Sequence, residues 1–144
     1  MKEQNFKNHT RLVPGYHGFT YILLAAALSL SLAMLFKAIN NKADVQLPVI
    51  LTLLCFVILF ISLYCRSFAL KAQDRAIRAE ENFRHFILTG SPLDKRLRMG
   101  QIIALRFAPD AEFVALAKRA VDEHLDSKTI KMSIQNWRAD HHRA

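Results

Sequence analysis

The sequence lacks charged residues over two long stretches. Phe19–Phe36 and Leu47–Cys65 contain no Asp, Glu, Lys or Arg. A helix needs about 20 predominantly apolar residues to cross a bilayer, and each stretch fits once its flanking residues are included. Two buried helices of a soluble core are the alternative, but such runs leave no polar face for water. We therefore predict an all-α membrane protein built on a two-helix transmembrane hairpin.

Helix-breaking residues are absent from the second apolar stretch and from the residues after it. Between Pro48 and Gly90 the sequence has no further glycine or proline. Proline suits the first turn of a helix, and glycine suits its carboxyl-terminal cap. We predict one helix over 47–90, about 60 Å long at 1.5 Å per residue, of which roughly half extends beyond the membrane.

Catalytic and metal-binding patterns are missing as well. There is no Gly-rich phosphate loop and no nucleophile elbow. The six histidines do not show the spacing of a closed zinc site, and neither cysteine is near a histidine in the sequence. Ten helical residues separate Cys55 from Cys65 by about 15 Å, which is beyond disulfide reach. We therefore expect no enzyme, no cofactor and no metal site.

Basic residues flank the two apolar stretches unevenly. Seven lie in the segment before the first stretch or in the dozen or so residues directly after the second: Lys2, Lys7, Arg11, Arg66, Lys71, Arg75 and Arg78. The loop between the stretches has only Lys37 and Lys42. Because Lys and Arg near membrane spans stay on the cytoplasmic side, both chain ends are expected in the cytoplasm. The net charge of +8 then reflects topology and attraction to anionic lipid head groups.

These features divide the chain into five segments. The first apolar stretch is too long for the core of a secretory signal, so we interpret it as a retained span. The predicted segments are a cytoplasmic amino-terminal segment (1–18), a first span (19–39), an extracytoplasmic loop (40–46), the long helix (47–90) and a cytoplasmic cluster of short helices (91–144). The expected location is a bacterial inner membrane.

A heptad pattern runs along the cytoplasmic half of the long helix. Small and aromatic residues recur at alternating spacings of four and three: Cys65, Ala69, Ala72, Ala76, Ala79, Phe83 and Phe86. This spacing predicts a coiled-coil seam, either for self-association or for docking the chain's own later helices. Asp74–Arg78 and Glu80–Arg84 are expected to pair at i, i+4 on its flanks.

The first span has its own pattern of small residues. Ala25, Ser29 and Ala33 lie at i, i+4 and i+8, a spacing that lets two helices approach closely. The second span of the same chain is the first candidate to pack on this face.

Three short helices are predicted in the cytoplasmic cluster. Ser91 and Pro92 suit the start of one, and Pro109-Asp110 suits the start of the next. The second has an apolar stripe, which comprises Phe113, Leu116, Ala117, Ala120 and Val121. Ser127 is expected to cap the third, whose stripe continues through Ile130, Ile134 and Trp137. Such a small core is expected to pack on another surface.

Both ends of the chain resemble an uncharacterised family of small bacterial proteins with two predicted spans. The resemblance rests on "QNFKNH" followed by R-x-V-P-x-Y-H, and on "QIIALRFAPDAEFVALAKRA" and "IKMSIQNWRADHHR". The matching positions are Gln4, Asn5, Asn8, His9, Arg11, Arg106, Phe107 and Trp137. The family implies no activity, but it implies that the two ends act as a pair on the cytoplasmic side.

The function expected from these features is that of a scaffold, an accessory subunit or a small homo-oligomer with a cytoplasmic interaction surface. The polar amino-terminal residues are expected to bond the exposed ends of the cytoplasmic helices. The expected partners are the lipid bilayer and a second copy or a membrane complex. An oligomeric pore is the first alternative, with Thr20, Ser29, Ser31, Thr52 and Ser62 as its polar lining. A membrane-tethered DNA-binding regulator using Lys95, Arg96 and Arg98 is the second, opposed by the acidic residues Asp122, Glu123 and Asp126.

Overall fold

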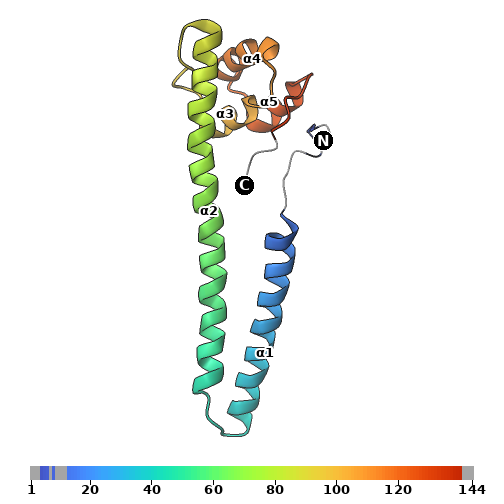
Figure 1. Cartoon of the computed structure of the whole chain (residues 1–144), viewed down its shortest axis with the longest axis vertical. Coiled ribbons are helices and arrows are strands. Elements are labelled where there is room, and N and C mark those ends of the chain that lie inside the picture. The colour runs from blue at the N-terminus through green and yellow to red at the C-terminus, as the bar shows by residue number, and fades with distance from the viewer. Residues whose placement is uncertain (1–3, 7, 9–12, 141–144) are drawn as a thin grey trace. The chain divides into compact units, whose positions relative to one another are not determined.

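The computed structural model describes residues 4–6, 8 and 13–140. Within this part of the chain the structure has helices and no strand, as the sequence predicted. The elements are η1 (Gly15–Thr20), α1 (Tyr21–Asn40), α2 (Gln46–Thr89), α3 (Met99–Leu105), α4 (Asp110–Asp122) and α5 (Ser127–Ser133) (Figure 1). They form two compact units, Leu12–Phe68 and a second made of Met1–Arg11 with Ala69–Ala144, and α2 contributes to both. We call them the hairpin unit and the head unit.

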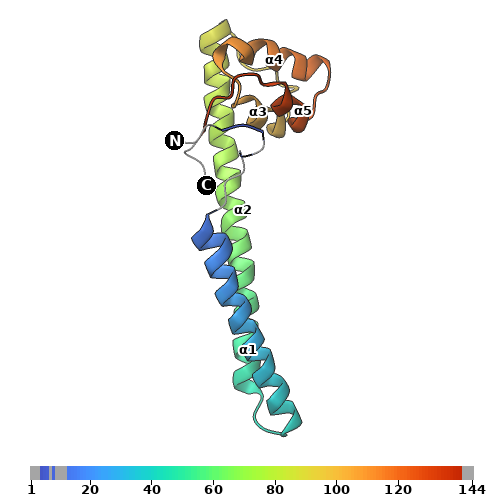
Figure 2. The same ribbon diagram turned by 90° about the vertical axis from the view of Figure 1, so that its right-hand side faces the viewer.

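In the hairpin unit, α1 lies alongside the first part of α2 in both views (Figures 1 and 2). The helices Gly15–Asn40 and Gln46–Thr89 are long and apolar enough to cross a membrane. Thr52 of α2 connects them, because its hydroxyl lies 3.2 Å from Ser31 Oγ of α1; the same hydroxyl lies 2.8 Å from the Pro48 carbonyl of its own helix. Near the other end, the Tyr21 hydroxyl lies 2.9 Å from Ser62 Oγ.

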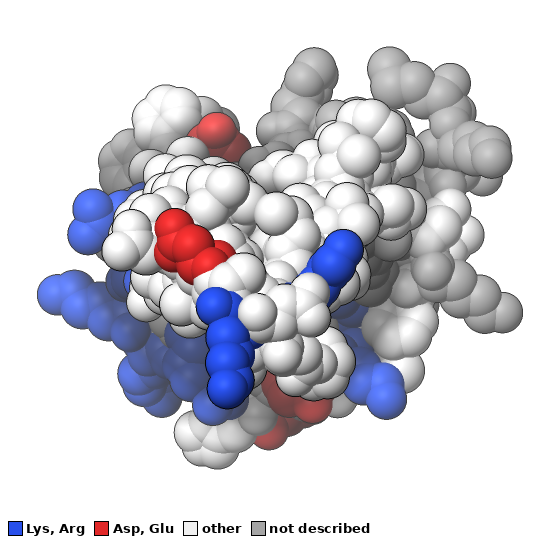
Figure 3. Space-filling view, turned by 90° about the horizontal axis from the view of Figure 1, so that it is seen from below, with Lys and Arg blue, Asp and Glu red and all other residues white. Residues whose placement is uncertain are grey.

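The outer surface of the hairpin unit is apolar. Large aliphatic and aromatic side chains on both helices are exposed, for example Leu30, Phe36 and Phe60 at 56–68%. The described charged residues of this unit are Lys37, Lys42, Asp44 and Arg66. Figure 3 accordingly shows a foreground that is mostly uncharged, with few charged side chains.

The small-residue stripe of α1 does not pack on α2, although the second span was the first candidate for its packing partner. Ala25, Ser29 and Ala33 are all exposed. The residues of α1 that lose exposure lie on another face, and they are Tyr21, Leu24, Leu28, Ser31, Leu35 and Ala38. The face that packs on α2 includes Ser31, whose hydroxyl bonds the Leu28 carbonyl of its own helix and accepts from Thr52 across the helix pair. Packing of the stripe on a different helix stays a prediction.

The head unit has a conventional apolar core. Its largest fully buried side chains are Phe107, Phe113, Ile102, Leu105 and Ile130. The apolar stripe predicted for α4 is confirmed, since all five of its residues are buried. Buried apolar area of this kind stabilises a fold by about 25 cal/mol per Å².

Gln101 joins the short helices of the head. Its side-chain amide donates to the carbonyls of Ala120 (3.0 Å) and Leu125 (2.8 Å), at the end of α4 and just beyond it. Its oxygen accepts from the backbone N–H of Arg98 at 2.7 Å, at the start of α3. Gln101 is only 5% exposed. Because its side-chain amide makes all these hydrogen bonds, it fixes the orientation of α3 against α4.

The prediction that a helix begins at Ser91 is wrong, because residues 91–98 form a loop before α3. The Leu93 N–H donates to Asn82 Oδ1 on α2 at 2.9 Å, and the Arg96 N–H donates to Asp94 Oδ1 at 2.8 Å. Side chains that bond backbone donors in this way compete with helix formation. Leu93 and Leu97 then enter the core from a loop.

Both ends of α5 differ from the prediction, whereas the end of α2 agrees with it. α5 is capped by Asp126, which accepts from Thr129 N–H at 2.7 Å, and not by Ser127. It ends at Ser133, so Ile134 and Trp137 belong to the carboxyl-terminal segment. α2 ends at Thr89 and is followed by Gly90 as the predicted cap, whose φ of +72° is the left-handed conformation that favours glycine.

Candidate functional site

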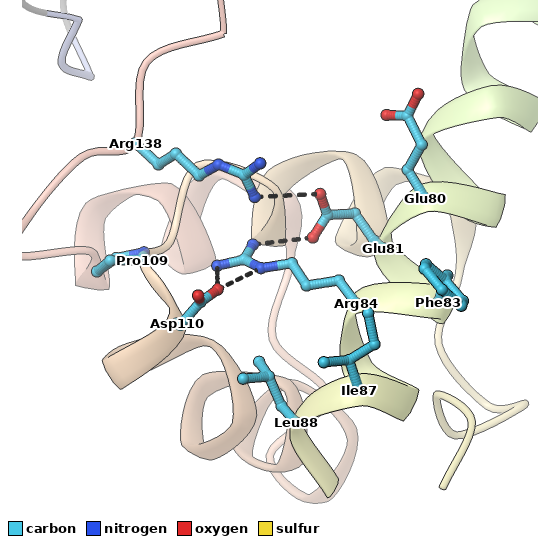
Figure 4. A pocket seen from close by; sticks show the side chains of 9 residues that line it. All are labelled: Glu80, Glu81, Phe83, Arg84, Ile87, Leu88, Pro109, Asp110 and Arg138. Carbon is cyan, nitrogen blue, oxygen red and sulfur yellow. Dashed lines mark hydrogen bonds and ion pairs between the residues drawn. The ribbon is translucent and has the colours of Figure 1, made fainter. Parts of the chain in front are cut away.

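An ion network joins α2 to the start of α4 in the head unit. The Arg84 guanidinium donates to Glu81 at 3.0 Å and to Asp110 at 2.6 Å (Figure 4). It also donates to the Ala108 carbonyl at 2.8 Å. It also lies over the Phe113 ring, 4.3 Å from the centroid. The planar guanidinium can make these contacts together because its donors fan out in fixed directions.

Glu81 extends the network to the carboxyl-terminal segment. Its side chain is only 7% exposed, and its other oxygen lies 3.9 Å from Arg138 Nη1. The Arg138 N–H donates to the Phe107 carbonyl at 2.7 Å. A buried carboxylate needs such partners, because removing it from water costs several kcal/mol. The predicted Glu80–Arg84 pair is not formed, since Arg84 turns to Glu81 and Asp110.

A cavity of about 610 Å³ lies beside this network. It is lined by Glu80, Glu81, Phe83, Arg84, Ile87, Leu88, Pro109, Asp110 and Arg138. Glu80 takes no part in the network, and its carboxylate points away from both arginines (Figure 4). Among the described residues, no group of three or more His, Cys, Asp or Glu side chains is placed to hold a metal ion. The ion pairs hold α2 to the start of α4, and the cavity beside them is edged by apolar side chains.

The two chain ends meet at a second site in the head unit. The Gln4 side chain accepts from Asp140 N–H at 2.8 Å and donates to the Asp140 carbonyl at 3.1 Å. The Asp140 carboxylate lies 3.1 Å from Arg106 Nη1. The Arg106 side chain is 7% exposed, and its charge lies 4.7 Å from the Phe107 ring centroid. The Trp137 ring lies 4.9 Å from the same ring.

The structure thus gathers four of the positions singled out by the resemblance: Gln4, Arg106, Phe107 and Trp137. Asn5 and Asn8 are exposed and bond each other, since Asn5 N–H donates to Asn8 Oδ1 at 2.7 Å. His9 and Arg11 lie outside the described residues. Sequence reasoning missed Asp140 as the residue that links Gln4 to Arg106, although it lies within the quoted carboxyl-terminal motif.

The seam residues of α2 are on the outside of the head unit. Ala72, Ala76, Ala79, Phe83 and Phe86 are all exposed, so the chain's own later helices do not cover them. The covered side of the same helix instead carries Ile77 and Glu81, at 6% and 5% exposure. One face of α2 therefore holds the head, and another face remains open.

Hydrogen bonds lower the pKa of several carboxylates of the head unit, among them Asp94 and Glu112. Hydrogen bonds from Arg96 lower the pKa of Asp94 to about 2. Burial alone would raise the pKa of Glu112, but the donors of Gln135 and Asn136 outweigh it and lower that pKa. Glu112 receives the N–H groups of Gln135 and Asn136 at 2.9 and 3.0 Å. It thus attaches the carboxyl-terminal segment to α4.

These features define a class: an all-helical protein with two helices long enough to cross a membrane and a compact helical head. The chain belongs to a family of unknown function, DUF6526, whose model matches residues 1–144. No curated protein and no solved structure matches it.

Proposed function

We propose that this protein is a membrane-embedded scaffold or accessory subunit that presents a helical interaction surface to the cytoplasm. The observation that carries the proposal is the open face of α2. Phe83, Phe86 and Ile87 are 52–66% exposed on it, next to three exposed alanines. Apolar side chains that gather on one face outside a bilayer mark a surface for another protein.

The hairpin unit supports the membrane part of the proposal. Its buried residues include Ser31 and Thr52, whereas its large aliphatic and aromatic side chains are mostly exposed. In water this arrangement is unfavourable, but in a bilayer it satisfies both groups, since lipid solvates apolar side chains and hydroxyls must find internal partners. The uneven basic residues then favour a cytoplasmic location for both chain ends.

Cysteine labelling tests this topology. In a chain with Cys55→Ser and Cys65→Ser, Asn41→Cys should react with a membrane-impermeant thiol reagent added outside intact spheroplasts. Lys95→Cys, in the exposed loop before α3, is the matched control and should react only after the membrane is opened. Labelling of Asn41→Cys from the inside alone would contradict the proposal.

The interaction surface is tested by the mass of the complex released in a gentle detergent. The wild-type protein should run above the 16.5 kDa of one chain. The double variant Phe83→Ser/Phe86→Ser should lose the additional mass, because it removes the apolar side chains from the open face. Met132→Ser is the control, since Met132 is also an exposed apolar residue of the head, at 56%. A wild-type mass of one chain would contradict an interaction role.

The observations favour a scaffold over a pore. A pore needs polar groups that face its lumen, and Thr52 and Ser31 bond each other inside the hairpin. The Ser62 carbonyl and hydroxyl bond Tyr16 and Tyr21 in the same unit. The second alternative, a DNA reader, gains no support from Arg96, because its guanidinium is paired with Asp94 at 2.7 Å.

A further inference from the structure

We propose that the open face of α2 binds a second copy of this chain, parallel and in register, through the heptads between Ala69 and Phe86. This inference rests on the proposed function and names the partner for its surface. The seam places Ala69, Ala76 and Phe83 at a positions, and Ala72, Ala79 and Phe86 at d positions. All six are exposed.

The charges beside the seam identify a second copy as the occupant. Arg75 occupies a g position, and Glu80 occupies the e position five residues later. In a parallel two-stranded coil, a g residue faces the e residue five positions further along the partner, where ion pairs set partner choice and orientation. Arg75 therefore meets Glu80 of the other copy, and twofold symmetry makes the pair twice.

Both side chains are available for this pairing. Within residues 13–140, no hydrogen bond or ion pair occupies the side chain of Arg75 or of Glu80, and both are exposed. Their neighbours behave differently, because Glu81 and Arg84 are held in the network with Asp110. The chain thus uses the charges that hold its own head and leaves this pair open.

The head reaches the edge of the seam at Asn82, a g position that accepts from the Leu93 N–H, but it leaves the a and d positions exposed. Ile77 and Arg84 occupy b positions and Glu81 an f position, which point away from the partner in a coiled coil. The same residues lie on the covered side of α2, where they hold the head unit. One helix can therefore carry its head on one side and pair on the other.

The residues of the seam explain why anchoring in a membrane would strengthen the dimer. Alanines let two backbones approach closely but bury little area, so most of the apolar contact comes from Phe83 and Phe86. A short coil of this kind is weak when its helices are free in solution. Anchoring both copies in one bilayer raises their effective concentration and, because they share one topology, leaves only the parallel arrangement.

Site-specific cross-linking of the full chain in membranes tests the register. In the Cys55→Ser/Cys65→Ser background, Ala79→Cys should form a dimer with a short thiol cross-linker, since d positions face each other. Arg78→Cys, one residue away and at an outward c position, is the matched control and should not. Equal yields at both positions would show random collision and overturn the proposal.

Charge exchange tests the partner pair. Arg75→Glu or Glu80→Arg alone should lower the Ala79→Cys cross-link by about threefold or more, since each dimer loses two ion pairs and gains like charges. The double variant Arg75→Glu/Glu80→Arg should restore it. Failure of the double variant to recover would overturn the parallel register.

The outcomes also separate this inference from the proposed function. A native mass equal to two chains supports the dimer. A mass of one chain plus a different protein, lost in Phe83→Ser/Phe86→Ser, overturns the dimer and leaves the scaffold role standing. Inverted labelling at Asn41 overturns the proposed function itself.

Discussion

The hairpin unit and the head unit bury opposite kinds of residue. In the hairpin, Ser31 and Thr52 are 4% and 8% exposed while Phe36 and Phe60 are 68% and 56% exposed. In the head, Phe107 and Phe113 are fully buried, and most charged side chains are outside. The same physical rule acts in both, because each side chain goes where its surroundings cost least free energy. The difference supports the proposal that the hairpin unit lies in a bilayer and the head unit lies in water.

The sharpest test of this contrast compares two phenylalanines. Phe113→Ala should destabilise the head by about 3–5 kcal/mol, because it leaves a cavity in a closed core. Phe60→Ala, in the hairpin, should leave the head unchanged. Trp137 is the only tryptophan and packs on Phe107, so its fluorescence during urea unfolding in detergent reports the head. Equal effects of the two changes would break the contrast.

The buried charges of the head should give the next largest effect. Arg84→Met removes the main partner of Glu81, which is 5% exposed, and should cost about 2–3 kcal/mol of unfolding free energy. This is less than a fully isolated buried charge costs, because Arg138 stays within reach. Arg84→Lys should retain part of the stability, since it keeps the charge but loses the branching donors. No loss in Arg84→Met, measured by the same fluorescence, would contradict a structural role for the network.

Acid should weaken the attachment of the carboxyl-terminal segment through Glu112. Its pKa is lowered from an ordinary value of 4.5, so the folded state favours the charged carboxylate. The stabilisation is complete above that ordinary value and is lost as the pH falls through the lower folded pKa. The urea midpoint should fall in this range, and Glu112→Gln should show a smaller fall. An identical pH profile in that variant would exclude Glu112 as the source.

The smallest effect is expected inside the hairpin. Thr52→Val removes the hydrogen bond to Ser31 and should cost about 0.6 kcal/mol, a usual value for such bonds between membrane helices. Ser29→Ala is the control, because Ser29 bonds the Ala25 carbonyl of its own helix and is exposed. The loss of helical circular dichroism during SDS titration measures both. If Thr52→Val costs more unfolding free energy than Arg84→Met, the expected order of the two effects is wrong.

Much of the fold was predictable because local sequence features decide it. Gly90 and the absence of other helix breakers predicted the end of α2, and the apolar spacing in α4 predicted its buried stripe. Residues 91–98 were not predictable in this way. Ser91 and Pro92 favour a helix start locally, but Asn82, distant in sequence, takes the Leu93 N–H and selects a loop.

The residues of the candidate sites could likewise be predicted from the sequence only in part. The heptad spacing predicted a seam whose residues are exposed in the structure, although its role stays a prediction, and the resemblance pointed to Gln4, Arg106, Phe107 and Trp137. The partners that connect them could not, because Asp140 and Gln4 are 136 residues apart. The pairing of Arg84 was also mispredicted, since i, i+4 spacing ignores an acidic residue that arrives from another helix.

Composition and periodicity alone therefore decide that this chain is helical, that two of its helices are apolar enough to cross a membrane, and that α2 is continuous. These properties depend on neighbouring residues, whose effects are local. Tertiary packing decides which face of α2 the head covers, which face stays open and how the chain ends join. Those choices depend on whether buried polar groups such as Glu81 and Arg106 find partners, and their partners come from distant parts of the chain.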